Sequence, residues 1–392
     1  MAKDESLTPL KMLLFSFHAT NTIILSYLPL YLKYKGLTGT EIGWVLAVGP
    51  FASIFSQPFW GYLSDKHKTV KLMIQICVVG LLITSILFFQ MNTLIAIILM
   101  GSVFYFFTSP IGALGDSLAQ RSAENMGVPF GSIRTWGSIG FAFSSLIIGA
   151  ILTRVGVQYM IWPYLFFGVM ALLVTFKLPD AKVDSEPIDF SDVKQLILNK
   201  PYVVFLVFML FITITHRAND SFIGLYIDQL GGTESLVGVA WFVGVMSEAA
   251  IFAFAGFWFR KLHPLIFISI AGALYTLRWF LFVLVDHPYQ IIALQVFHGL
   301  TFGIFYTAAF DYVSRIIPKT LQSTGHLVFF ATFFGVSGIV GSLVGGAIID
   351  SLGGATLYSW LAWSAFIGTI LMIVYHMMPF GKDSSKQARL QK

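Results

Sequence analysis

The sequence predicts an all-α membrane protein with twelve transmembrane helices in two pseudo-symmetric six-helix bundles. Three observations predict this fold: the composition, the recurrence of long apolar segments, and a polar stretch midway along the chain. Hydrophobic residues make up 57% of the 392 residues, charged residues make up 11%, and the mean hydropathy is +0.80. Soluble domains of this size do not have such a composition.

Apolar segments long enough to cross a bilayer recur along the whole chain. Each is a candidate helix because a helical span takes about 20 apolar residues. From the first residue to the last, we expect twelve spans. Their approximate ranges are 8–33, 41–63, 71–90, 94–118, 132–153, 157–178, 201–226, 235–259, 264–285, 288–313, 322–349 and 354–379.

Lys and Arg residues in the loops and at the ends of the spans mark the cytoplasmic side, because positively charged loops tend not to be translocated. Eighteen of them fall in one set of segments, which includes both termini, whereas only Lys33, Lys35 and Arg154 fall in the opposite set. We therefore expect both termini in the cytoplasm. The basic residues are scattered over many short loops, which argues against a nucleic-acid partner.

A long polar stretch from about Pro179 to Lys200 follows the sixth span and divides the chain into halves. We expect an N-terminal bundle over 1–178, a cytoplasmic linker over 179–200, and a C-terminal bundle with a cytoplasmic tail over 201–392. The halves echo one another: GDSLAQR followed by FAFSSLIIGAILTRVG is matched by FDYVSR followed by GIVGSLVGGAIIDSLG. Such repeats predict a binding site between the halves near mid-membrane.

Charged or titratable residues lie inside several predicted spans, where an unpaired charge is costly. Residues kept at such positions usually handle a substrate or an ion. The residues are Arg134, Arg217, Asp220, Glu248, Arg278 and His298.

Motifs of common enzymes and ATP-driven pumps are missing from the sequence. It contains no GxxxxGK[ST] phosphate loop, no HExxH and no GxSxG. Cys77 is the only cysteine, which excludes an intrachain disulfide, and the eight histidines are dispersed. We therefore expect no enzyme activity, no metal site and no cofactor.

Several motifs carry a resemblance to a known family. GYLSDK at 61–66, followed by Lys71, resembles the loop motif of the major facilitator superfamily, and FSQPFWGYLSDK resembles its lactose-permease branch. PFGSIRTWGSIGF, GVMSEAAIFAF, LRWF and LQVFHGLTF also resemble the 3-phenylpropionate permease group. The likeness covers most of the chain. It implies alternating access and proton-coupled uptake, with Gly61, Asp65 and Lys66 as a gating motif.

The resemblance also implies roles for individual residues. Asp116 and Arg134 match residues that hold sugar hydroxyls in lactose permease. Glu248 matches a second sugar-binding carboxylate, and His298 matches a histidine beside it. Arg278 matches an arginine of the proton-translocation group.

Two positions depart from the pattern of lactose permease. Phe141 stands where that family stacks a tryptophan on the galactosyl ring, so a galactoside is not indicated. Thr301 stands where that family has its main protonated glutamate, so the proton is expected on another residue. Phe141 remains a candidate substrate contact because its ring accepts many flat solutes.

The remaining titratable residues suggest where that proton binds. A buried carboxylate changes its proton affinity when a cation approaches or withdraws. Glu248 or Asp220 is therefore expected to bind the proton, with Arg278 and Arg217 as modulators. On the seventh span, Asp220 lies three residues after Arg217 and four after His216, so this helix can pair its own charges.

Three functions remain open at this stage. The first is proton-coupled uptake of a sugar, nucleoside or aromatic acid, and the second is proton-coupled antiport that exports drugs or metabolites. The third is a non-transporting sensor or scaffold. For either transporter we expect a monomer in the cell membrane, in a bacterium the inner membrane, with protons as coupling ion and a small-molecule substrate and the lipid bilayer as partners.

Some of the same residues also have a purely structural interpretation. For Glu248 and Arg278, the alternative to the functional interpretation is a static ion pair that fixes helix packing. Asp311 and Arg315 are more simply explained as a loop latch near the cytoplasmic end of the tenth span than as solute ligands.

Overall fold

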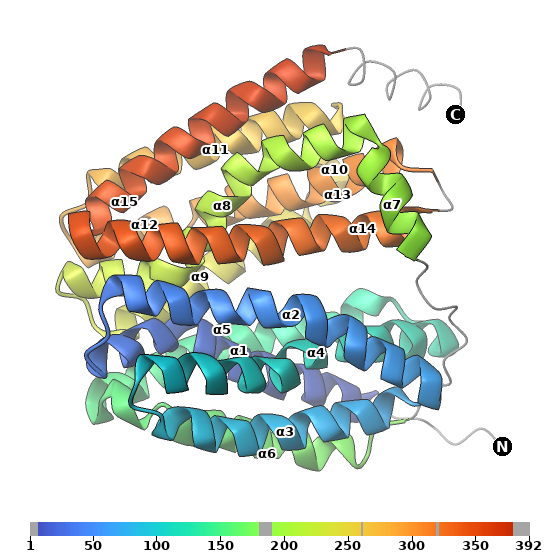
Figure 1. Cartoon of the computed structure of the whole chain (residues 1–392), viewed down its shortest axis with the longest axis vertical. Helices are drawn as coiled ribbons and strands as arrows, with labels where there is room; N and C mark the ends of the chain where they lie inside the picture. The colour runs from blue at the N-terminus through green and yellow to red at the C-terminus, as the bar shows by residue number, and fades with distance from the viewer. Residues whose placement is uncertain (1–6, 180–189, 260–261, 319–320, 379–392) are drawn as a thin grey trace. The chain divides into compact units, whose positions relative to one another are not determined.

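The computed structural model describes residues 7–179, 190–259, 262–318 and 321–378 (Figure 1). These ranges are almost entirely helical and contain no strand. The all-α prediction is therefore confirmed. Most of the predicted linker and the predicted tail after 378 lie outside the described residues.

Contacts divide the chain into two compact units. The first consists of Met1–Pro187 with Thr233–Phe242, and the second of Ile188–Gly232 with Val243–Lys392. Each unit is described separately below.

The first unit is built from six long helical segments and a short 3-10 turn. α1 is the most buried of them and packs on α5 and α6, while α4 packs on α2 and α3. The elements are α1 (Thr8–Tyr34), α2 (Gly39–His67), α3 (Val70–Gln90), α4 (Leu94–Met126), α5 (Phe130–Val155), η1 (Val157–Tyr159) and α6 (Ile161–Thr175).

Local sequence sets the ends of these helices. Thr38 and Glu41 form a capping box at the start of α2, and the hydroxyls of Thr69 and Thr93 accept backbone N–H groups at the starts of α3 and α4. Gly127 ends α4 in the left-handed conformation that glycine adopts without strain. Polar caps thus fall where the apolar runs of α2, α3 and α4 begin.

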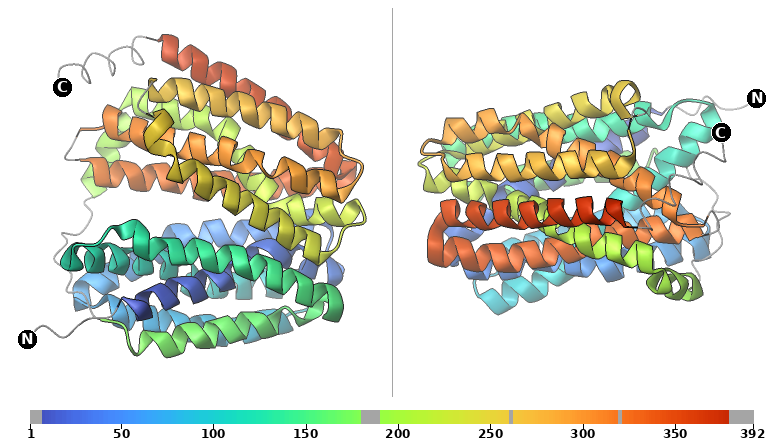
Figure 2. Two further views of the ribbon diagram at one scale, coloured as in Figure 1. Left: turned by 180° about the vertical axis from the view of Figure 1, so that it is seen from behind. Right: turned by 90° about the horizontal axis from the view of Figure 1, so that it is seen from above.

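The second unit contains the remaining helices. α8, α11 and α15 pack side by side in Figures 1 and 2. The elements are α7 (Phe190–Leu198), α8 (Lys200–Gln229), α9 (Glu234–Ala253), α10 (Ala255–Trp258), α11 (Pro264–Val283), α12 (Pro288–Leu294), η3 (Gly299–Gly303), α13 (Ile304–Ile316), α14 (Gln322–Phe330), η5 (Ala331–Val336) and α15 (Ser337–Met377). The first half of α9 belongs to the first unit and its second half to this one.

Eleven helical segments of the described residues are long and apolar enough to cross a membrane. The last of them, Thr324–Met377, is 54 residues long and contains a non-helical backbone at Gly353, where φ is 81° and ψ is 172°. This break falls between the predicted spans 322–349 and 354–379. The segment therefore supplies two spans, and the prediction of twelve agrees with the structure.

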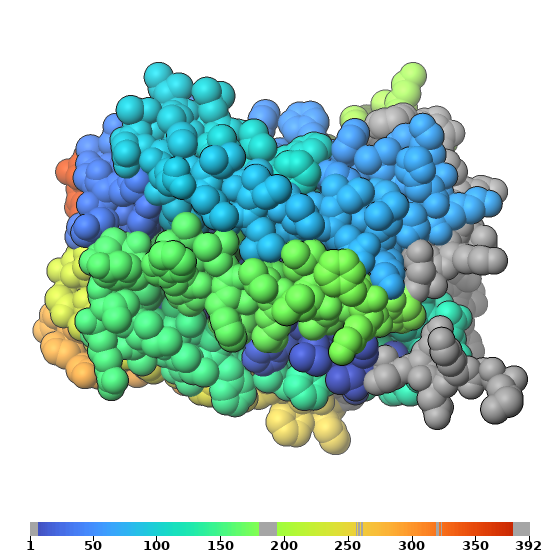
Figure 3. Space-filling view, turned by 90° about the horizontal axis from the view of Figure 1, so that it is seen from below, coloured from blue at the N-terminus to red at the C-terminus, as the bar shows by residue number. Residues whose placement is uncertain are grey.

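Large apolar side chains are exposed on the outer helices, as expected of residues that face lipid. Figure 3 shows α6 in green beside α3 in blue on one face of the first unit. On α6, Trp162, Phe166 and Leu173 are each more than half exposed. This face has the character of a lipid-contacting surface.

Two spans of the second unit contain π-helical turns. η3 follows His298 in the tenth span, and η5 contains Phe333, which packs against the His216 ring. Such turns insert an extra residue into the helix and occur often at functional sites. Polar residues of the second unit lie close to these two turns.

Candidate functional site

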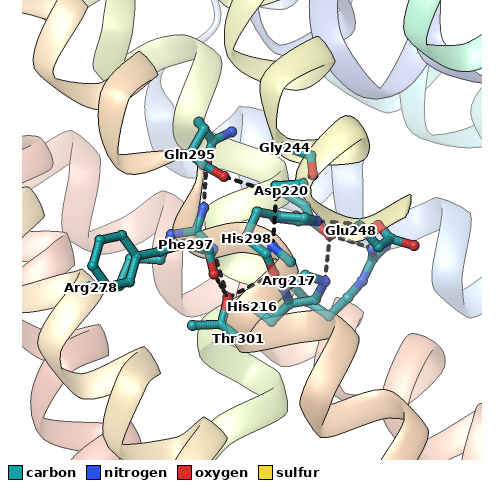
Figure 4. Close-up of polar contacts among 12 residues, drawn as sticks. His216, Arg217, Asp220, Gly244, Glu248, Arg278, Gln295, Phe297, His298 and Thr301 are labelled. Atoms are coloured by element: carbon teal, nitrogen blue, oxygen red, sulfur yellow. Dashed lines mark hydrogen bonds and ion pairs between the residues drawn. The ribbon is translucent and has the colours of Figure 1, made fainter. Parts of the chain in front are cut away.

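A cluster of titratable side chains lies inside the second unit, contributed by α8, α9, α11 and the tenth span (Figure 4). On α8, Arg217 Nη1 lies 2.8 Å from Asp220 Oδ2, and His216 Nε2 lies 3.5 Å from the same oxygen. The predicted pairing of charges along this helix is therefore present. Asp220 is only 5% exposed, and its Oδ1 has no hydrogen-bond partner.

Glu248 on α9 pairs with His298. Their Oε2 and Nε2 atoms are 3.5 Å apart, and the Glu248 side chain is 23% exposed whereas that of His298 is 6% exposed. The second ring nitrogen of His298, Nδ1, is buried without a hydrogen-bond partner. The resemblance placed a histidine beside this carboxylate, and the structure brings the two together.

Arg278 does not pair with Glu248, contrary to the ion pair considered from the sequence. Its guanidinium donates to Thr301 Oγ1 at 3.1 Å and to Gln295 Oε1. It also lies over the Trp279 ring, 4.6 Å from the centroid. These neutral partners occupy the fully buried guanidinium, so the cation is held without a carboxylate in contact.

Aromatic rings enclose the two histidines. Phe302 stacks on His216 with ring centroids 4.7 Å apart and planes inclined by 6°, and the centroids of the His216 and His298 rings are 5.5 Å apart. Tyr275 Oη lies 3.0 Å from His216 Nδ1. Tyr275 was not identified from the sequence, although its position three residues before Arg278 puts both on one face of α11.

The first unit holds a second polar group. Arg134 Nε on α5 lies 3.0 Å from Asp116 Oδ1 on α4, with side chains 33% and 38% exposed. The two residues that the resemblance placed together are thus in contact.

His18 on α1 lies beside that pair and was missed by the sequence analysis. A Cβ added at Gly137 would lie 2.5 Å from His18 Cδ2 and 2.6 Å from Arg134 Nη1, so both side chains approach the same bare stretch of α5. His18 Nε2 is buried without a hydrogen-bond partner. A lone histidine in an apolar run gave no signal of this, because the contact depends on how α1 packs on α5.

An aromatic pair lies one turn further along α5. The Phe141 ring packs edge-on against Trp241, with centroids 5.7 Å apart, and Trp241 Nε1 is buried without a hydrogen-bond partner. Thr22 Oγ1 donates to the Phe141 carbonyl oxygen and so fixes α1 at this level. Trp241 comes from the part of α9 that belongs to the first unit and was not predicted.

The gating-motif residues lie at the end of α2. Gly61, Asp65 and Lys66 are helical, and Lys66 Nζ lies 6.0 Å from the centroid of the Tyr62 ring. Lys71 Nζ donates to the carbonyl oxygens of Phe176 and Leu178, which follow the end of α6. This part of the motif thus caps a neighbouring helix.

Asp311 and Arg315, which the sequence suggested as a loop latch, form an ion pair one turn apart on a single helix. Arg315 Nε lies 2.6 Å from Asp311 Oδ2 on α13. Among the described residues, no group of three or more His, Cys, Asp or Glu is arranged to hold a metal ion.

Comparison with known proteins gives consistent matches along the chain. Residues 7–360 match the MFS_1 like family. An uncharacterized transporter of Bacillus subtilis, YwbF, is 28% identical over 342 residues, covering 86% of this chain and 85% of that protein. The maltose permease of Geobacillus stearothermophilus is 25% identical over 367 residues, covering 93% and 92%. The crystal structure of the nucleoside transporter NupG superposes with a TM-score of 0.81 at 18% identity, covering 95% and 98%.

Proposed function

The chain belongs to the MFS_1 like family, a family of membrane transporters rather than enzymes, and on that premise we propose that it takes up a small hydroxylated solute together with protons. The observation that carries this proposal is the cluster in the second unit. Two carboxylates, two imidazoles and two guanidiniums lie there among apolar spans. Ionisable groups in such surroundings are costly, which favours a role in moving protons.

The charge balance in the first unit supports a neutral solute. Arg134 already has the Asp116 carboxylate as its counter-ion. A solute carboxylate would have to displace that group or face its repulsion, whereas hydroxyls can donate to Asp116 and accept from Arg134 at once. Neutral sugars and nucleosides therefore fit this pair better than aromatic acids do.

Two further polar atoms of the first unit have no hydrogen-bond partner and are available to a hydroxylated solute. His18 Nε2 and Trp241 Nε1 are buried without partners. Buried polar groups without partners are costly, so a ligand that satisfies them gains affinity. The Phe141–Trp241 pair would cover the apolar face of a sugar or nucleobase ring. We assign solute binding to Asp116, Arg134, Phe141, His18 and Trp241.

Proton coupling is assigned to the second unit. Glu248 or Asp220 gains and loses the proton, because each lies in contact with an imidazole. Arg217 compensates the charge of Asp220 when that group is ionised. Arg278, held by Thr301 and Gln295, contributes a fixed positive charge nearby.

The setting of this activity forms part of the proposal. The protein would act as a monomer in a cell membrane, in a bacterium the inner membrane, with both termini in the cytoplasm. It would use the proton as its coupling ion and no other cofactor. Solute and lipid would be its partners.

Transport in proteoliposomes tests the proposal. Purified protein would first be screened by thermal shift against maltose, sucrose, uridine and 3-phenylpropionate, since a ligand that binds the folded state raises its stability. The solute that binds would then be used, labelled, for counterflow and for uptake with the outside acidified. Uphill uptake into the vesicles supports symport. Expulsion driven by the opposite gradient would indicate the antiport alternative, and binding without flux would indicate a sensor.

A further inference from the structure

The two carboxylates of the second unit are joined by two neighbouring imidazoles. His298 Nε2 contacts Glu248 Oε2, and His216 Nε2 contacts Asp220 Oδ2, each at 3.5 Å. The ring centroids of the two histidines are 5.5 Å apart, with planes inclined by 40°. Figure 4 shows the four side chains gathered in one region. They follow one another in the order Glu248, His298, His216 and Asp220.

The two ends of this series differ in how far they are buried. The Glu248 side chain is 23% exposed, whereas those of His216 and Asp220 are 4% and 5% exposed. The other polar contact of Asp220 is Arg217, which remains protonated in proteins and does not pass protons on. A proton that moves to Asp220 therefore has its best route through the two imidazoles.

We propose that His298 and His216 carry protons between Glu248, the more exposed end, and Asp220, the nearly buried end, which stores the coupling proton. This inference rests on the proposed proton-coupled function and adds His216, a residue for which neither the family resemblance nor the solute site gives a role. An imidazole suits the task because it accepts a proton on one nitrogen and releases one from the other.

The proton transfers balance, and neither imidazole is left charged at the end. The Glu248 carboxyl gives its proton to His298 Nε2, and that ring releases the proton on Nδ1, which has no partner. His216 takes it up at Nδ1 once the Tyr275 hydroxyl yields that position, and releases the proton on Nε2 to Asp220 Oδ2. Glu248 ends ionised, Asp220 ends protonated, and both rings end neutral in their other tautomer.

The packing keeps the two histidine rings close together and buried. Phe302 stacks on His216 and lies 5.8 Å from the His298 ring, and it belongs to the π-helical turn η3. Charged and titratable groups face His216 from its own helix, from α11 and from the tenth span. They are Arg217, Asp220, Tyr275, Arg278 and His298.

A pH-jump infrared measurement on solute-free protein in lipid vesicles tests this route. The carboxyl C=O band of protonated Asp220 is identified by its loss in Asp220→Asn. After a drop from about pH 8 to about pH 5, a range that spans histidine titration, the wild type should show this band rapidly. In His216→Phe, which keeps a flat ring against Phe302 but removes both nitrogens, the band should appear at least about tenfold more slowly.

His326→Phe is the matched control. His326 also stacks on a phenylalanine, Phe310, at 3.9 Å, and its Nε2 lies 2.9 Å from the Ser314 hydroxyl. This variant should keep the wild-type rate. If His216→Phe does not fold, His216→Gln, which also lacks a titratable ring, is expected to show the same slowing.

Two results would overturn the relay: an Asp220 band that appears at the wild-type rate without His216, or no Asp220 band at all. The measurement uses no solute, so it separates this inference from the proposed function. A relay that works in a protein without coupled uptake would leave the inference standing and reject the function.

Discussion

The two units each place an acid–arginine pair among apolar spans, but the acidic side chains of the two pairs differ in exposure. Asp116 and Arg134 are each about one-third exposed, whereas Asp220 is nearly buried. A partly exposed pair can exchange hydrogen bonds with a solute at little cost. A buried pair that loses one partner is destabilised by about 3–5 kcal/mol, so it changes state most readily by taking up a proton. The comparison therefore supports the proposed division, with solute recognition in the first unit and proton binding in the second.

The largest effect is expected from Glu248→Gln. The amide cannot titrate, so uptake driven by a pH gradient should fall about 100-fold or more. Counterflow, which needs no net proton movement, should stay close to wild type. Both rates would be measured in the same vesicles, and unchanged gradient-driven uptake would remove Glu248 from the proton path.

Arg134→Lys tests the first unit. An ammonium is a point charge and cannot reproduce the planar donor set of a guanidinium, so solute affinity should fall by about 2 kcal/mol, or about 30-fold. Isothermal calorimetry with the solute from the thermal-shift screen would measure this. Arg315→Lys makes the same change in the Asp311–Arg315 pair and should leave affinity unaltered. If Arg134→Lys binds the solute with wild-type affinity, the role of Arg134 is structural and it does not bind the solute.

Gly137→Ala tests whether His18 belongs to the solute site. The added methyl would lie 2.5 Å from His18 and 2.6 Å from Arg134, so one of them must move, at a cost of about 1–3 kcal/mol for overpacking. We expect several-fold weaker solute binding. Gly131→Ala on the same helix meets nothing within 4 Å and serves as the control. Equal affinities in the two variants would exclude His18 from the solute site.

Trp241→Phe should have a smaller effect. It keeps an aromatic ring against Phe141 but removes the indole N–H, which is worth about 1 kcal/mol if the solute accepts from it. A loss of about fivefold in affinity for a hydroxylated solute is expected. The exposed Trp363, changed to Phe, provides the control. If Trp241→Leu binds as tightly as the wild type, this ring is not a contact.

The smallest effect concerns a histidine outside the spans. Burial, followed by the nearby His376 and Arg315, lowers the pKa of His263 from 6.5 to about 4. Its contribution to stability is therefore complete above pH 6.5 and is lost as the pH falls towards 4.

His263→Asn should keep the N-cap of α11 and remove this dependence. Because the group is about half exposed, the change should stay below about 1 kcal/mol, a degree or two in Tm between about pH 7 and about pH 5. A variant at the exposed His67 provides the comparison. An identical pH dependence of Tm in wild type and His263→Asn would contradict this account.

The sequence predicted the helices because the length of an apolar run is a local property. Thr38, Thr69 and Thr93 mark the helix starts where the apolar runs begin. The contacts within α8 were also predictable, because the spacing of Arg217 and Asp220 is fixed by one helix.

Contacts between helices were harder to predict from the sequence. The sequence suggested a partner for Arg278 by charge alone, whereas packing of α11 on the tenth span gives it Thr301 and Gln295. His18 lies close to Arg134 because the bare backbone of Gly137 leaves room for both side chains, and Trp241 meets Phe141 through the packing of α9. Neither position carries a motif of its own.

The separation of tasks is tested most directly by measuring counterflow and gradient-driven uptake together in Arg134→Lys and Asp220→Asn, in vesicles of one lipid composition. Arg134→Lys should lower both rates at low solute concentration and recover both at high concentration. Asp220→Asn should lose gradient-driven uptake at every concentration and keep counterflow. Parallel loss of both rates in both variants, without recovery at high solute, would contradict the division between the two units.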